Sequence, residues 1–175
     1  MDTDSSAVIA LPTAASTHAF GRDQLAPMLE PGDLLIARGR LGVGKTALVQ
    51  GIGAGLGVEG AVLSPTFVIA RIHRGGRLPL VHVDAYRLES LAEIDDLDLD
   101  TDLATSVTVV EWGEGMVEHL SDEHVLIELK IQPHDGGFLE NRQGEEGAEV
   151  DDRPRTAQLT PHGPRWVARL AAASP

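Results

Sequence analysis

The sequence contains no cysteine among its 175 residues. This absence excludes disulfide bonds and thiol catalysis, and it fits a reducing compartment. Basic residues are also scarce, since 14 lysines and arginines stand against 27 aspartates and glutamates, for a formal net charge of -13. A protein that binds nucleic acid through its own surface normally clusters Lys and Arg against the phosphates. We therefore expect no binding to DNA, and only indirect contact with RNA.

Long apolar runs are lacking as well. No stretch approaches the roughly 20 apolar residues that cross a membrane, and residues 1–6 lack the basic start and apolar core of a signal peptide. We expect a cytoplasmic protein with no membrane partner. The length suits a single domain spanning 1–175. Within it, the segment 134–153 is rich in Gly, Asp and Glu, and we predict that it is a mobile acidic loop.

One segment of the chain matches a phosphate-binding pattern. Gly39 to Thr46 reads GRLGVGKT and fits G-x-x-x-x-G-K-[ST], with one of only two lysines at the lysine position. Composition alone would give roughly 0.002 matches in a chain of this length. An apolar strand is predicted at 33–38 and a helix from Gly44 to about Leu56, which is the setting that the motif requires. We interpret the segment as a P-loop.

The P-loop predicts a site for ATP and Mg²⁺. Glycines let the backbone wrap closely around phosphate, and successive N–H groups at a helix start favour an anion. Lys45 is expected to reach the β and γ phosphates, and the Thr46 hydroxyl to bind Mg²⁺. The predicted nucleotide-binding residues of this loop are Gly39, Gly42, Val43, Gly44, Lys45, Thr46 and Ala47.

Two acids follow apolar runs further along the chain: Asp84 after LVHV and Glu111 after VTVV. Ligands of open α/β sheets lie beyond the carboxyl ends of the strands, so both acids are expected near the phosphates. One would hold the metal and the other would polarise the attacking water, and spacing does not say which. Ser64-Pro65-Thr66 is either a switch segment or a Pro-stiffened turn. His82, on an apolar strand, is interpreted as a core histidine.

The alternation of elements predicts an α/β fold. Strands are expected at 7–11, 33–38, 67–72, 78–84, 107–111, 124–131 and 156–160, and helices at 13–29, 44–56, 90–102 and 166–173. This order is typical of a three-layer P-loop domain with a mixed sheet that is partly antiparallel toward the C-terminus.

Several motifs in this order resemble one family. GRLGVGKT is followed by SPTF at 64–67, HVDAYRL at 82–88 and VVEWGEG at 109–115, and T-x-x-F-G stands at 17–21. Over about 11–120 the chain resembles the TsaE family. The resemblance implies a bacterial ATPase that works with TsaB and TsaD to form N6-threonylcarbamoyladenosine in tRNA, and that meets tRNA only through that complex.

The resemblance also implies roles for single residues. Glu111 would be the second metal ligand beside Thr46, and Asp84 and Thr66 would be needed for hydrolysis. Trp112 would lie near the site, although a core position is its other interpretation. Thr17 would approach the nucleotide from the N-terminal helix. The chain departs from the family at Arg40, where an aspartate is usual.

Other functions on the same loop stay open. A small-molecule kinase would need an arginine-bearing lid, which Arg71, Arg74 and Arg77 could imitate, although a basic hairpin tip is the simpler interpretation. A GTPase is unsupported because no N-K-x-D follows the P-loop and Lys130 stands in K-I-Q-P. A module that binds ATP without turnover is a further possibility.

Overall fold

The computed structural model describes residues 6–65, 68–88, 90–96, 103–133 and 153–173. The predicted acidic loop at 134–153 lies outside these residues except for Arg153. The strands are β1 (Ala7–Leu11), β2 (Leu34–Arg38), β3 (Ala70–His73), β4 (Leu80–Asp84), β5 (Val107–Glu111), β6 (His124–Ile131) and β7 (Arg155–His162). The helices are α1 (Ala14–Phe20), η1 (Gly21–Leu25), α2 (Ala26–Met28), α3 (Lys45–Leu56), η2 (Ala85–Arg87), α4 (Leu91–Asp95), η3 (Glu118–Leu120) and α6 (Pro164–Ala173).

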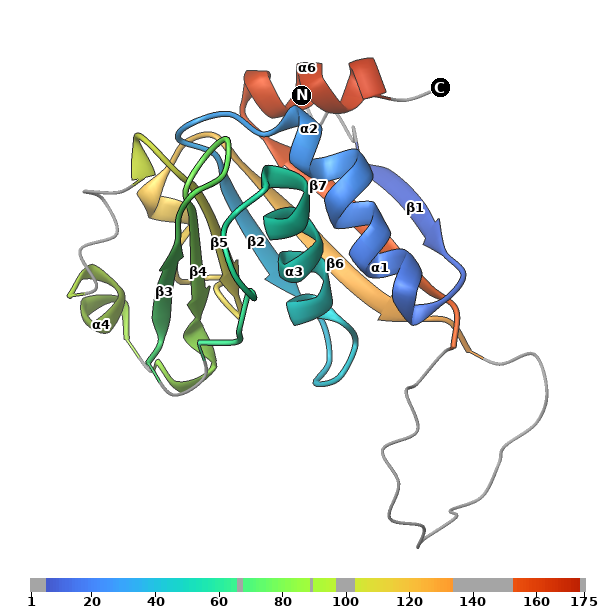
Figure 1. Cartoon of the computed structure of the whole chain (residues 1–175), viewed down its shortest axis with the longest axis horizontal. Coiled ribbons are helices and arrows are strands. Elements are labelled where there is room, and N and C mark those ends of the chain that lie inside the picture. Colours follow the sequence, from blue (N-terminus) through green and yellow to red (C-terminus); the bar gives the residue numbers. More distant parts are fainter. Residues whose placement is uncertain (1–5, 66–67, 89, 97–102, 134–152, 174–175) are drawn as a thin grey trace, which may run out of the picture.

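These strands form one sheet in the order β1-β7-β6-β2-β5-β4-β3. The four central strands β6, β2, β5 and β4 run parallel to one another, whereas β3, β7 and β1 pair antiparallel at the two sides (Figure 1). The predicted mixed sheet is therefore confirmed. Because the parallel strands share one direction, their carboxyl ends meet at the same edge, beyond β2.

Alternate residues of β2 serve two hydrophobic cores. Leu35 and Ala37 belong to the larger core, which the helices α1 to α3 and α6 complete, whereas Leu34 and Ile36 belong to the smaller one. Figure 1 shows α1, α2 and α3 on one side of the sheet. On the opposite side, Ile94 of α4 packs into the smaller core. A strand buried on both faces has no polar side to alternate with, which explains its continuous apolar sequence.

Glycines allow α1 and η1 to pack closely against α3. A Cβ on Gly21 would lie 2.5 Å from the Leu48 carbonyl oxygen, and a Cβ on Gly51 would collide with the carbonyl oxygen of His18. Gly21 and Gly51 therefore serve the packing of these helices. This contact brings the helix that carries Thr17 to the start of α3, beside the P-loop.

Three predicted elements differ in detail. The helix predicted at 90–102 is observed as α4, Leu91–Asp95, and residues 97–102 lie outside the described residues. The predicted helix at 13–29 begins with a capping box between Thr13 and Ser16, but it passes through the π-helical turn η1 before α2. The strand predicted at 67–72 instead begins at Ala70, since the N–H groups of Val68 and Ile69 both donate to the Pro65 carbonyl. Ile69 also has a positive φ of 67°. The carbonyl of Pro65 thus takes up the two N–H groups, and the strand begins only after them. Thr66 and Phe67 lie outside the described residues.

Candidate nucleotide-binding site

The P-loop joins the end of β2 to the start of α3, as the sequence predicted. Gly39, Gly42 and Gly44 have φ values of 143°, 77° and 110°, which L side chains rarely adopt. A Cβ on Gly39 would also come within 2.5 Å of the Leu129 carbonyl oxygen on β6. The glycine positions of the motif are therefore required by backbone conformation, and the loop ends at a helix N-terminus that favours anions.

Lys45 folds back over the loop that precedes it. Its Nζ donates to the carbonyl oxygens of Gly39, at 2.7 Å, and Arg40, at 3.0 Å. It also lies 3.9 Å from the centroid of the Trp112 ring. Burial lowers the pKa of Lys45, while the negative charges of Glu111 and Asp84 oppose that shift. The two acceptors are neutral carbonyls, so a phosphate can replace them at the ammonium group.

The hydroxyl of Thr46 meets the carboxylate of Glu111. Thr46 Oγ1 donates to Oε1 at 3.0 Å and lies 3.2 Å from Oε2. Adjacent oxygens around an octahedral Mg²⁺ lie about 3 Å apart, since each bond is about 2.1 Å long. The pair therefore fits neighbouring Mg²⁺ ligands. Among the described residues, no cluster of three or more His, Asp or Glu could hold a metal, and Mg²⁺ in nucleotide sites commonly takes one or two protein ligands besides water and phosphate.

Asp84 lies beside Glu111 at the carboxyl ends of β4 and β5, where the two residues are paired in register. Its Oδ1 accepts a hydrogen bond from the Tyr86 N–H at 3.1 Å, which orients the side chain at the start of η2. The structure thus brings together both strand-end acids that the sequence singled out. The two acids differ in their hydrogen-bond donors: the Thr46 hydroxyl donates to Glu111, and the Tyr86 backbone amide donates to Asp84.

His82 is the residue whose part the sequence analysis missed. Its side chain is fully buried, as expected for a core histidine, but Nε2 lies 2.7 Å from Oε1 of Glu111. The available signal was strand alternation, because His82 stands two positions before Asp84 and so shares its face of β4. Predicting the contact would also have required knowing that β4 pairs with β5.

Trp112 lies in the wall of the site and not in the core. It has a positive φ of 63°, and its ring centroid is 5.1 Å from that of Tyr86. Thr17 is fully buried on α1, and its Oγ1 would lie 3.7 Å from a Cβ on Gly44. No described residue hydrogen-bonds this hydroxyl. Thr17 therefore adjoins the P-loop at Gly44. Arg155 of β7 adjoins it at the same place and is a buried neighbour that the sequence analysis did not identify.

These side chains surround a cleft of about 330 Å³. Of the predicted site residues, Gly39, Val43, Ala47 and Thr17 shape or flank the loop without lining the cleft, and Thr66 lies outside the described residues. The lining residues are Leu41, Gly42, Gly44, Lys45, Thr46, Ser64, Asp84, Tyr86, Arg87, Glu111 and Trp112.

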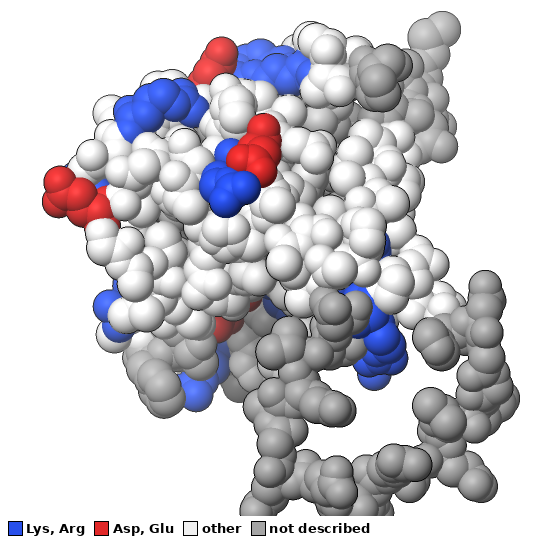
Figure 2. Space-filling model, turned by 45° about the vertical axis from the view of Figure 1, so that its right-hand side comes forward, with Lys and Arg blue, Asp and Glu red and all other residues white. Residues whose placement is uncertain are grey.

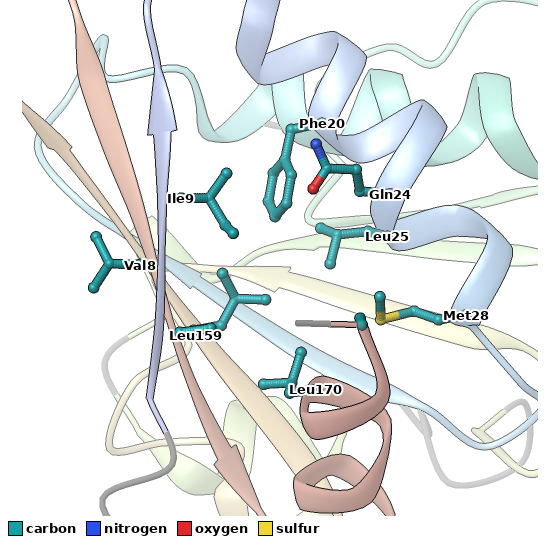
Figure 3. Close-up of a pocket in the computed structure, with 10 residues that line it drawn as sticks. Val8, Ile9, Phe20, Gln24, Leu25, Met28, Leu159 and Leu170 are labelled. Atoms are coloured by element: carbon teal, nitrogen blue, oxygen red, sulfur yellow. The ribbon is translucent and has the colours of Figure 1, made fainter. Parts of the chain in front are cut away.

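A second hollow of about 380 Å³ has a different character. It lies between β1, the helices α1 to α2 and α6, and Figure 3 shows Phe20, Leu25 and Leu170 around it. Its lining includes no charged side chain among the described residues, with Gln24 as the polar member. Such a lining cannot neutralise the negative charge of a triphosphate, so this hollow is not the candidate nucleotide site.

On the face of the molecule in Figure 2, the described residues form no broad basic patch of the kind that binds nucleic acid. Figure 2 shows one face on which the described Lys, Arg, Asp and Glu form small separate groups among uncharged residues. Among the described residues, no helix is both long and apolar enough to cross a membrane.

Comparison with known proteins agrees with the resemblance in the motifs. A family model described as threonylcarbamoyl adenosine biosynthesis protein TsaE matches residues 11–142. A protein named tRNA threonylcarbamoyladenosine biosynthesis protein TsaE in Streptomyces coelicolor is 57% identical over 109 residues, which cover 61% of this chain and 74% of that protein. The protein of the same name in Mycobacterium tuberculosis is 46% identical over 133 residues, covering 71% and 79% respectively.

A solved structure extends the likeness to the whole fold. The crystal structure of Bacillus subtilis YdiB, a P-loop fold, superposes with a TM-score of 0.67 at 27% sequence identity. The match covers 96% of this chain and 93% of that one. The predicted P-loop architecture is therefore confirmed.

Proposed function

Because the chain belongs to the TsaE family of proteins for threonylcarbamoyladenosine biosynthesis in tRNA, we propose that it binds Mg-ATP in the P-loop cleft and hydrolyses it. The reaction is ATP and water to ADP and phosphate. The single observation that carries the proposal is the contact of Thr46 with Glu111 directly beside a glycine-lined loop and Lys45. That arrangement offers a hydroxyl, a carboxylate and a cation around one small cleft.

In this proposal the positive groups of the site bind phosphate, and the oxygen-bearing side chains bind Mg²⁺ and the attacking water. Loop N–H groups from about Gly42 to Ala47, together with the Lys45 ammonium, bind and neutralise the phosphates. Thr46 and Glu111 would hold Mg²⁺, which when bound withdraws negative charge from the phosphate oxygens. Asp84, which lines the cleft beside Glu111, would accept a hydrogen bond from the attacking water and orient it.

The partners in this proposal are the TsaB and TsaD proteins, and tRNA is met only through their complex. The cleft of about 330 Å³ is lined by residues of the P-loop and by the two strand-end acids Asp84 and Glu111. A net charge of -13 opposes direct binding of tRNA across the surface. ATP hydrolysis would therefore act on a protein partner, and we expect slow turnover by the isolated chain.

One of the three arginines of the proposed kinase lid is already bound within the fold. Arg77 donates to the carbonyl oxygens of Leu29, at 3.0 Å, and Ala26, at 2.7 Å. This arginine is thereby tied to the end of α2. An arginine held by two backbone carbonyls is not poised to swing over a nucleotide.

Reconstitution of the tRNA modification tests the proposal. Purified TsaB and TsaD, an unmodified tRNA and the remaining substrates would be incubated with wild-type protein, with Lys45→Ala or with no addition. We expect wild-type protein to give modified tRNA and Mg²⁺-dependent phosphate release, and Lys45→Ala to match the omission. Full modification with Lys45→Ala would contradict the proposal. A new phosphorylated metabolite in place of free phosphate would favour the kinase.

A further inference from the structure

We propose that His82 is a positioning residue that holds the Glu111 carboxylate in place for the divalent cation. The inference rests on the proposed function, since it concerns the cation that accompanies ATP. It assigns a task to a buried side chain that touches neither the cleft nor the P-loop.

Two donors converge on one carboxylate oxygen. His82 Nε2 lies 2.7 Å from Glu111 Oε1, and Thr46 Oγ1 donates to the same oxygen at 3.0 Å. A carboxylate that accepts from one donor can still turn about its terminal torsion, which is broad. A second donor on another strand fixes that torsion. The His82 bond is the shorter of the two, and it comes from the interior of the sheet.

Strand pairing makes this contact rigid. Asp84 pairs with Glu111 and His82 pairs with Val109 across β4 and β5, so His82 and Glu111 are diagonal neighbours on one face. Both side chains are buried, at 0% and 5% exposure. The donor therefore comes from a regular strand in the core, not from a loop, and its position does not depend on the P-loop conformation.

The chemistry fixes which ring nitrogen carries the hydrogen. An ionised carboxylate only accepts hydrogen bonds, so Nε2 must donate and carries the proton. Nδ1 then has no hydrogen-bond partner among the described residues. An unpaired buried nitrogen costs stability, and an apolar side chain would fill the same space without that cost. The histidine is therefore explained by its bond to Glu111 and not by packing alone.

A matched pair of substitutions separates positioning from packing. His82→Gln keeps a donor near the place of Nε2, whereas His82→Met has similar length and no donor. Mg²⁺ is titrated into each protein with a fluorescent ATP analogue at fixed concentration. We expect His82→Met to raise the Mg²⁺ concentration at half-saturation about 10- to 100-fold, as is usual for groups that orient a metal ligand. His82→Gln should stay within about 3-fold of wild type.

Nucleotide binding in EDTA is the control, and it should change less than about 2-fold in both variants. Equal Mg²⁺ affinity in wild type and His82→Met would overturn the inference while leaving the proposed function intact, and so would a Gln variant as weak as Met. A wild-type protein that binds no Mg-nucleotide would instead defeat the proposed function itself.

Nitrogen NMR of the wild-type ring gives a test that does not depend on folding of a variant. We expect the tautomer with hydrogen on Nε2, and a resonance that shifts when Mg²⁺ and nucleotide are added. A ring with hydrogen on Nδ1 alone would overturn the inference.

Discussion

Thr46 and Glu111 are 65 positions apart in the chain, yet the hydroxyl of one donates to the carboxylate of the other at 3.0 Å. The parallel pairing of β2 with β5 produces the contact, because it sets Glu111 beside Ala37 at the end of the strand that leads into the P-loop. The two residues proposed to hold the cation are thus brought together by the fold before any nucleotide arrives. Such preorganisation removes the cost of arranging the ligands on binding.

Substitutions at Thr46 should separate the hydroxyl from the shape of the side chain. Thr46→Val keeps the branched shape but removes the oxygen, so Mg²⁺-dependent affinity for ATP should fall at least about 10-fold. Thr46→Ser keeps the oxygen and should stay within about 3-fold. Calorimetric titration with and without Mg²⁺ measures both. Val and Ser variants of equal affinity would show that this hydroxyl is not a ligand.

Asp33 at the start of β2 anchors the C-terminal helix. It is 1% exposed and accepts from Arg169 at 2.6 Å and Arg165 at 3.2 Å. Arg169 is 15% exposed and Arg165 47%, so solvent screens the second pair much more. Arg169→Ala leaves a buried carboxylate poorly compensated and should lower the free energy of unfolding by about 2 kcal/mol.

Arg165→Ala is the matched comparison, with an expected loss below about 1 kcal/mol. Urea denaturation of both variants gives the two values. If both variants lose the same free energy of unfolding, burial of the arginine does not decide how much each ion pair stabilises the fold.

The contact between α1 and α3 should be intolerant of a single methyl group. A Cβ on Gly51 would collide with the backbone carbonyl of His18, which cannot move without shifting α1. Gly51→Ala should therefore destabilise the fold by about 3 kcal/mol, despite the higher helix propensity of alanine. Ala54→Ser, exposed on the same helix, should change stability by less than about 0.5 kcal/mol. A thermally stable Gly51→Ala protein would contradict the close packing.

Stability should fall in mild acid partly because of His73. Burial lowers the pKa of His73, and the neighbouring His82 and Arg71 lower it further. In the unfolded chain His73 has its usual pKa of 6.5, whereas in the folded protein its pKa is lower. Between these two pKa values the unfolded chain binds a proton that the folded protein does not. The free energy of unfolding therefore decreases as the pH falls through this range.

His73→Gln should flatten that decrease, measured by denaturant titrations between about pH 7 and pH 5. The same slope in His73→Gln as in wild type would exclude this histidine as the cause.

The parts of the site that could be predicted are those encoded locally. The P-loop can be recognised because its glycines and its lysine stand at fixed places within the short segment from Gly39 to Thr46. Asp84 and Glu111 can be recognised because each ends an apolar run. Strand spacing could not say which acid faces Thr46. The contact between Thr46 and Glu111 depends on the order of strands in the sheet, which cannot be predicted from any short segment of the sequence.

The same limit explains the missed neighbours. His82 contacts Glu111, which is 29 positions away in the chain, and Arg155 of the last strand lies beside Gly44 of the P-loop. Both contacts depend on which strands are neighbours in the sheet and on the register in which they pair. The late start of β3 has a different cause, since Pro65 accepts two N–H groups and holds the chain in a turn, whereas propensity alone favoured an earlier strand.

The central claim is that the P-loop binds the triphosphate of Mg-ATP with its amides and Lys45. Calorimetric titration of Mg-ATP into wild-type protein and Lys45→Ala, with AMP as a ligand that lacks the β and γ phosphates, tests it most directly. We expect 1:1 binding of ATP to wild type, a loss of at least about 10-fold with Lys45→Ala, and little binding of AMP to either. Equal affinity of both proteins for ATP, or no binding by wild type, would contradict the account.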